Sequence, residues 1–224
     1  MLRVGGVEVY DAWTTGEIGF TSPEVMAAGR LADDLIFEPG FVRGGAATIS
    51  ERYFSEPFSH LLERSEVTGE TEAGCWLSHG GSSMWQFGPP ESEIGSDIDI
   101  FTLPPIEPNQ PTPAIATASF ATALVDTPEV RAFMEFLASP EWGEIWATDP
   151  AVGFVSPNRR FDVSAYGDPS LDPQIAFNIE VASVAQTALE AGVLRFDASD
   201  LMPAEIGAGI DGVVTGAFWQ GMID

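Results

Sequence analysis

The chain has 224 residues with 34 acidic and 9 basic side chains, so its formal net charge is -25. This charge excludes general nucleic-acid binding, which needs a basic surface, and it disfavours docking on anionic lipid. Hydrophobic residues make up 45% of the sequence, enough for one large domain or two small ones, and the single cysteine, Cys75, excludes an internal disulfide and a cysteine-based zinc site.

The beginning of the chain reads like the middle of a fold. Residues 1–6 lack the apolar segment of a signal peptide, and an amphipathic pattern is already running at Tyr10, so the sequence predicts a fragment. Residues 10–20 are predicted as strand or loop. Ser22 then begins a helix that extends to about Phe37, because serine caps the amino end, proline fits the first turn and glutamate suits its positive pole.

Short elements follow the first helix. Residues 49–64 are predicted to be helical with an interruption near Pro57, residues 75–78 to form an apolar strand, and residues 84–87 to start a helix or strand. Residues 97–103 alternate strictly between polar and apolar side chains, which predicts a strand with one buried face.

The second half of the sequence is richer in helix signals. Residues 104–113 are proline-rich and carry no helix or strand signal, so we place a crossover between two lobes there. Residues 114–124 have small side chains and are predicted as a strand. Helices are expected to begin at Thr127 and Ser139, to run from Asp172 to about Ala191, and to run from about Gly212 to the end.

Two pairs of carboxylates are candidates for chemistry. A glycosidase needs two positioned carboxylates, and Asp197 with Asp200 is one pair that can be nominated. A chain with 34 acidic residues always offers such a pair, so capping and solvation are the favoured interpretation. Asp97 and Asp99 would share one strand face and suggest calcium, but the other oxygen ligands of a calcium loop are absent.

Three further motifs carry weaker signals. Residues 207–212 spell the glycine fingerprint of a dinucleotide site, but no predicted strand precedes them. His79 beside Ser82 and Ser83 would place base and nucleophile within one turn, which matches no triad template. His60 and His79 are the only histidines and do not form a helical metal pair. The sequence therefore predicts no cofactor, no metal and no catalytic residue.

The end of the chain sets carboxylates ahead of paired aromatics, the side chains that bond to hydroxyls and pack on sugar rings. Together with other segments, it resembles the carboxy-terminal half of extracellular sugar-binding proteins of ABC importers. The branch is that for alpha-glucosides, related to maltose-binding protein. The resemblance spans almost the entire chain in order and rests on residues 13–23, 74–77, 97–105, 126–141 (DTPEVRAFMEFLASPE, the most specific) and 195–203.

This resemblance implies an α/β, periplasmic-binding-protein-like fold of type II that is truncated, with a near-complete second lobe and a small piece of the first lobe. Residues 1–104 would belong to the second lobe, residues 105–159 would cross over and contribute to the first, and residues 160–224 would return. Because the part of the family's chain that builds most of the first lobe is absent, we also expect exposed apolar surface on residues 112–153.

The resemblance also implies a binding site without catalytic groups. Trp76 and Trp219 match aromatics that stack on sugar, and Ser119 and Phe120 match a strand that faces ligand. The other two matched aromatics are Trp85, after a turn near the cleft, and Phe218, beside Trp219. The alternative for each aromatic is packing in the core, where most aromatic side chains lie.

The function implied by the resemblance is that of the carbohydrate-binding component of an ABC importer, which binds an alpha-glucoside or oligosaccharide and is not an enzyme. Its partners would be the ligand and the membrane subunits of the importer, with no nucleic acid, and it would be a monomer. It would lie in the periplasm or outside the cell, with a lipid anchor possible in the family and the signal peptide not in this sequence. A truncated fragment without function and a glycoside-active enzyme are the alternatives.

Overall fold

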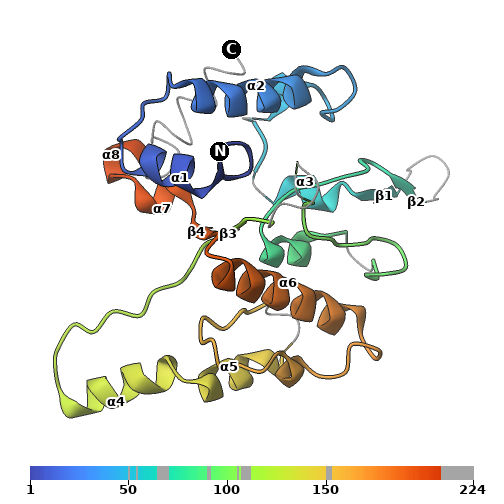
Figure 1. Cartoon of the computed structure of the whole chain (residues 1–224). Helices are drawn as coiled ribbons and strands as arrows, with labels where there is room; N and C mark the ends of the chain where they lie inside the picture. Colours follow the sequence, from blue (N-terminus) through green and yellow to red (C-terminus); the bar gives the residue numbers. More distant parts are fainter. Residues whose placement is uncertain are drawn as a thin grey trace. The chain divides into compact units, whose positions relative to one another are not determined.

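The computed structural model describes residues 1–49, 51–53, 55–64, 71–89, 92–104, 106, 112–149 and 153–207. These residues form a mixture of helices and short strands that divides into two compact units (Figure 1). The first unit contains Met1–Arg52, Pro104–Ala118 and the chain from Ala188 onward, and the second contains Tyr53–Leu103 and Ser119–Thr187. Each unit is therefore assembled from segments that lie far apart in the sequence.

The elements follow in chain order. They are α1 (Leu2–Thr14), α2 (Pro23–Phe37), the 3-10 helix η1 (Ala46–Thr48), α3 (Glu56–Ser59), β1 (Leu62–Arg64), β2 (Thr71–Ala73), the 3-10 helix η2 (Ser82–Phe87), β3 (Ala114–Ala116), α4 (Pro128–Leu137), α5 (Pro140–Ala147), the 3-10 helix η4 (Val163–Tyr166), α6 (Pro173–Glu190), β4 (Leu194–Phe196), α7 (Ala198–Leu201) and α8 (Ala204–Gly207). The strands pair as β1 with β2, antiparallel, and β3 with β4, parallel.

The helix starts predicted from capping residues are confirmed. The side-chain oxygens of Ser22, Thr127 and Ser139 each accept a hydrogen bond from the backbone N–H three residues later, at 3.5, 3.3 and 3.3 Å. A proline follows each of them at the first helical position, where a backbone N–H would have no partner within the helix, so its absence in proline costs no hydrogen bond. The long helix predicted from Asp172 is also confirmed, and Gly192 follows it with a φ of 72°, which favours glycine.

The prediction of strand or loop for residues 10–20 is wrong for residues 10–14, because α1 runs through to Thr14, and is confirmed as a loop for residues 15–20. Leu2, Tyr10 and Trp13 of this helix are all buried. Gly6, with a φ of 75°, interrupts the helical geometry inside α1 between Leu2 and Tyr10. Among the described residues of 49–64, the helix predicted there is limited to the single turn α3, which β1 follows.

Most of the predicted strands are also wrong. Residues 75–78 and 97–103 form no strand, and the strand predicted over 114–124 is limited to β3. Asp97 Oδ2 instead accepts the backbone N–H of Glu93 at 2.9 Å, and Asp99 Oδ1 accepts that of Ile100 at 2.9 Å. Aspartate side chains that accept hydrogen bonds from nearby backbone N–H groups favour turns. A strand also needs a partner strand, which an alternating pattern of polar and apolar residues does not supply.

The first unit is organised around the contact of α1 with β4. Tyr10 is 2% exposed, and its hydroxyl donates to the carbonyl of Phe196 at 2.8 Å. Arg195 donates from Nε and Nη2 to the two carboxylate oxygens of Asp11 at 2.6 and 2.8 Å. The buried side chains around these contacts are Leu2, Tyr10, Trp13, Val25, Ala198 and Met202. The contacts join residues more than 180 positions apart and fix where β4 lies.

We expect the Asp11→Asn variant to lose about 0.5–1 kcal/mol of unfolding free energy near neutral pH, because the pair is bidentate but partly exposed. The hydrogen bond from Arg195 lowers the pKa of Asp11 in the folded state. The stabilisation is therefore present above the unfolded pKa of about 3.9 and is lost as the pH falls through the lower folded value.

Urea unfolding at several pH values measures this difference. The control is Asp34→Asn, which makes the same charge change at an exposed position on α2. A loss for Asp11→Asn that stays constant from neutral pH down to pH of about 2 would contradict the assignment of the stabilisation to the ion pair.

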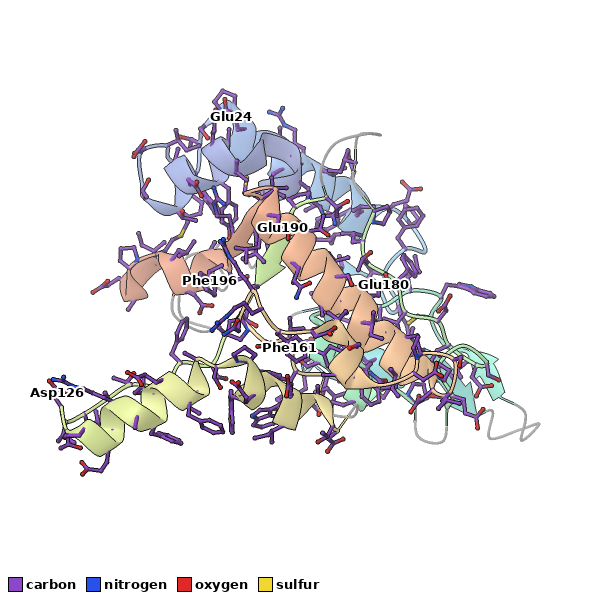
Figure 2. The ribbon with its side chains drawn as sticks, turned by 60° about the horizontal axis from the view of Figure 1, so that its bottom comes forward. Glu24, Asp126, Phe161, Glu180, Glu190 and Phe196 are labelled. Carbon is purple, nitrogen blue, oxygen red and sulfur yellow. The ribbon has the colours of Figure 1, made fainter. Side chains whose placement is uncertain are left out.

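The second unit has its core under α6. Phe161 is 4% exposed and meets the ring of Tyr166 edge to face at a centroid distance of 5.5 Å. Ala147 of α5 and Ala182 of α6 complete the buried cluster. Gly143 is required where α5 approaches this cluster, because a Cβ there would lie 2.7 Å from the ring of Phe161. Figure 2 shows Phe161 beside α6.

The expected apolar surface on residues 112–153 is present in the part of this segment that the structure describes. Its exposed large side chains are Ile115, Phe120, Leu124, Val125, Phe133, Phe136, Ile145 and Trp146. Among the described residues, no helix is both long enough and apolar enough to cross a membrane.

Candidate functional site

Trp76 is the most conspicuous aromatic of the second unit. It lies three residues beyond the end of β2, and its side chain is 89% exposed. Leu77 beside it is 75% exposed. The apolar sequence of this segment predicted a strand, whereas the structure has no strand there and exposes both side chains to solvent. Leu77 is thus a candidate that the sequence missed, although the run of apolar residues marks its position.

Two glycines allow the segment that carries Trp76 to pass close to the rest of the unit. A Cβ on Gly74 would lie 2.4 Å from the carbonyl oxygen of His60, and one on Gly80 would lie 2.4 Å from the ring of Phe58. Because neither position has room for a side chain, the backbone passes α3 closely on both sides of Trp76. The indole is therefore exposed on an anchored segment rather than on a free loop.

The end of α3 is fixed by a cluster of polar side chains. His60 Nδ1 lies 2.5 Å from Glu63 Oε1, and its Nε2 lies 3.3 Å from Glu56 Oε1. Both ring nitrogens are thereby occupied by local carboxylates. This arrangement supports the backbone against which Gly74 packs and leaves His60 a structural role.

Trp85 lies on η2 and is half-buried. Its Nε1 is buried without a hydrogen-bond partner among the described residues, and it lies 3.6 Å from the position of a Cβ on Gly153. Packing against the backbone near Gly153 therefore uses part of this indole. The assignment of Trp85 as a ligand contact stays a prediction.

Ser119 and Phe120 follow β3 in a segment without helix or strand, and both are exposed, Phe120 to 74%. Trp76, Trp85, Ser119 and Phe120 all belong to the second unit, where separate segments carry them. Phe218 and Trp219 lie outside the described residues. The predicted last helix and most of the glycine fingerprint of residues 207–212 also lie there.

Asp197, one of the carboxylates considered for catalysis, serves local structure. Asp197 caps α7, where its Oδ1 accepts the backbone N–H of Ser199 at 2.9 Å and the hydroxyl of Ser199 at 2.5 Å. Asp200 is exposed in the same helix. In the described ranges no three His, Cys, Asp or Glu side chains gather as a metal site would require. The capping interpretation is confirmed for Asp197.

The exposed indole of Trp76 offers a flat surface on which a ligand ring could stack. An exposed indole offers a flat apolar face for the C–H face of a ring, while its N–H is a hydrogen-bond donor. Such a surface binds without providing an acid, a base or a nucleophile.

Comparison with known proteins shows that this chain is similar in sequence to two solute-binding proteins. It is 34% identical over 226 residues to the "Alpha-glucosides-binding periplasmic protein AglE" of Rhizobium meliloti (strain 1021), covering all of this chain and 44% of AglE. It is 30% identical over 225 residues to the "Osmoprotective compounds-binding protein GgtB" of Synechocystis sp. (strain ATCC 27184 / PCC 6803 / Kazusa), covering all of this chain and 47% of GgtB.

No protein-family model and no solved structure matches the chain. The two sequence matches nevertheless confirm the resemblance to solute-binding proteins that residues 13–23 and 126–141 indicate. The chain spans about half the length of the curated relatives it matches. Both relatives are described by what they bind, and neither is described as an enzyme.

Proposed function

We propose that this chain is a portion of the solute-binding component of an ABC importer and that its ligand is an alpha-glucoside or a related oligosaccharide. The observation that carries the proposal is the exposed indole of Trp76 on a segment anchored at Gly74 and Gly80. It is supported by the 34% identity, over the whole chain, to a protein described as binding alpha-glucosides.

The chemistry proposed for the site is stacking combined with hydrogen bonding. The indole of Trp76 packs on the C–H face of a pyranose, since an uncharged ring is held best by an aromatic face. Trp219 and Phe218 supply a second aromatic contact, and Ser119 and Phe120 contact the ligand from the segment after β3. Trp85 contributes its indole near the same ligand.

The fold proposed around this site is the type II binding-protein fold. Residues 1–104 and 160–224 form the second lobe, and residues 105–159 cross over and contribute to the first lobe. Ligand binding closes two such lobes on the sugar in the complete assembly. The complex then delivers the sugar to the membrane subunits of the importer, in the periplasm or outside the cell, with the binding component as a monomer.

The match to GgtB supports a second ligand class, the osmoprotective compounds named for that protein. Osmoprotective compounds include sugars as well as zwitterions, and the two differ in what they require of a site. A sugar requires an aromatic face and hydroxyl partners, whereas a zwitterion such as glycine betaine requires an aromatic cage for its cation. One exposed indole at Trp76 fits the first requirement better.

Calorimetric titration of the purified chain with maltose, trehalose and sucrose tests the proposal. We expect saturable heat with at least one of these sugars and a Kd of about 1 mM. This Kd corresponds to a binding free energy of roughly -4 kcal/mol. Glycine betaine should give none, and a nitrophenyl glucoside should not be hydrolysed. Turnover of the glucoside, or heat with glycine betaine alone, would contradict the proposed function.

A further inference from the structure

The ring of His60 lies between two carboxylates, one at each of its nitrogens. Nδ1 is 2.5 Å from Oε1 of Glu63 on β1, and Nε2 is 3.3 Å from Oε1 of Glu56 on α3. A neutral imidazole carries one N–H and donates to one acceptor, whereas the imidazolium cation donates from both nitrogens. Because ionised carboxylates only accept, both contacts form together only while His60 carries a proton.

The contact between His60 and Glu56 spans the whole of α3. Glu56 is the first residue of this helix of 4 residues, and His60 directly follows its last residue. A single helical turn is not stable in water by itself, so α3 depends on such side-chain contacts and on the packing of Phe58, which is 9% exposed. A Cβ on Gly80 would lie 2.4 Å from the Phe58 ring. Figure 1 shows α3 leading into β1.

The same cluster lies against the backbone of Gly74, two residues before Trp76. A Cβ on Gly74 would lie 2.4 Å from the carbonyl oxygen of His60 and 2.7 Å from Cδ of Glu63. The N–H of Gly74 also donates to the carbonyl of Leu61 at 3.2 Å. The histidine, its carboxylate partner and the backbone that leads to the exposed indole therefore form one network of contacts.

The neighbouring elements contribute further ionisable groups. Glu72 of β2 is the register partner of Glu63, whereas η2, which packs on α3, carries no ionisable side chain. After β2, the thiol of Cys75 donates to a backbone carbonyl at 3.6 Å, and His79 is exposed. Ordinary carboxyl groups are ionised and thiols protonated at about pH 7, so the proton that changes between about pH 6 and 8 is that of an imidazole.

We propose that His60 is a pH-dependent positioning residue for the segment that carries Trp76. The protonated ring donates to both carboxylates and holds α3 against Gly74 and Gly80. When the pH rises and the ring loses a proton, Nε2 faces the ionised Oε1 of Glu56 as a second acceptor, so this contact opens. Proton binding and attachment of the segment therefore favour each other, and the segment is held more firmly at the lower pH.

Hydrogen exchange of the sugar-free chain, followed residue by residue by NMR, tests this inference without a ligand. The protection factor of the Gly74 amide should fall about threefold from about pH 6 to about pH 8, the size of effect expected for a partly exposed ion pair. The amide of Val193 in the first unit, which donates to the carbonyl of Ala188 at 2.8 Å, should keep a constant protection factor. Constant protection at Gly74 would overturn the proposal.

The variant Glu56→Gln distinguishes the proton-dependent contact from a merely structural one. A glutamine amide donates to the neutral ring nitrogen, so protection at Gly74 should no longer fall as the pH rises. His60→Gln should also remove the pH dependence, and the matched control His79→Gln should retain it. A fall that persists in Glu56→Gln, or that disappears in His79→Gln, would refute the role of His60. The measurement on the parent chain decides the case if a variant does not fold.

Titration of the parent chain with maltose extends the inference to the ligand, and this part rests on the proposed function. The Kd should be about threefold larger at about pH 8 than at about pH 6, because the indole is then on a less firmly held segment. An equal Kd at the two pH values would overturn the inference. Absence of heat at both pH values, with the fall in protection at Gly74 intact, would count against the proposed function alone.

Discussion

Replacing Trp76 by alanine is expected to weaken sugar binding by the chain at least tenfold. Removal of the indole takes away the stacking surface, and a tenfold change corresponds to about 1.4 kcal/mol, which lies in the range of a single aromatic contact. Because the side chain is 89% exposed, its loss should leave the unfolding free energy within about 0.5 kcal/mol of the parent value. Calorimetric titration with maltose and urea unfolding measure the two quantities.

Phe41→Ala is the matched control for Trp76→Ala. Phe41 is also a large exposed aromatic, at 65%, but it belongs to the first unit and is not a candidate contact. It should bind maltose as the parent does. Equal affinities for the parent and Trp76→Ala would show that the indole is not the platform, whatever else binds the sugar.

Replacing Phe161 by alanine is expected to lower the unfolding free energy by about 3–5 kcal/mol. Phe161 is 4% exposed and packs on Tyr166, and Ala147 and Ala182 are too small to fill the space that its ring would leave. Such a loss is a large fraction of the roughly 5–15 kcal/mol that stabilises a typical domain, so the second unit should unfold at much lower urea.

The control for this change is Leu171→Ala, which removes a large apolar side chain that is 80% exposed in the same unit. It should change the unfolding free energy by less than about 0.5 kcal/mol. A loss below about 1 kcal/mol for Phe161→Ala would show that this ring is not central to the core of the second unit.

Features of the fold that depend on neighbouring residues could be predicted from the sequence. Ser22, Thr127 and Ser139 cap helices because each oxygen reaches an N–H three residues away, which the local sequence alone decides. Strands could not be predicted in the same way. Residues 97–103 alternate well, but alternation specifies a face and not a partner, and no partner strand lies beside them within the described part of the chain.

Contacts between residues far apart in the chain could not be predicted from the sequence either. Asp11 and Arg195 are 184 positions apart, and neither residue has a local pattern that indicates the ion pair between them. Residues 2–14 form α1, which the sequence did not indicate, and Gly6 interrupts its helical geometry.

The candidate site was predicted by resemblance more than by pattern. The apolar run at residues 75–78 predicts a strand, whereas the structure has none there and exposes Trp76; the ligand contact of Trp76 stays a prediction that the resemblance alone implies. The exposed surface of α4 was also expected only from the resemblance, because its sequence is that of an ordinary amphipathic helix. Trp219 and Phe218 stay predictions, since they lie outside the described residues.

Saturation-transfer difference NMR of maltose in the presence of the chain tests whether the indole of Trp76 holds the sugar ring, because it works at millimolar affinity and reports which sugar protons touch the protein. We expect strong transfer to the C–H protons on one face of a pyranose ring and loss of that transfer in Trp76→Ala. Transfer that is spread evenly over the sugar, or that survives unchanged in Trp76→Ala, would contradict the claim that this exposed indole holds the ring.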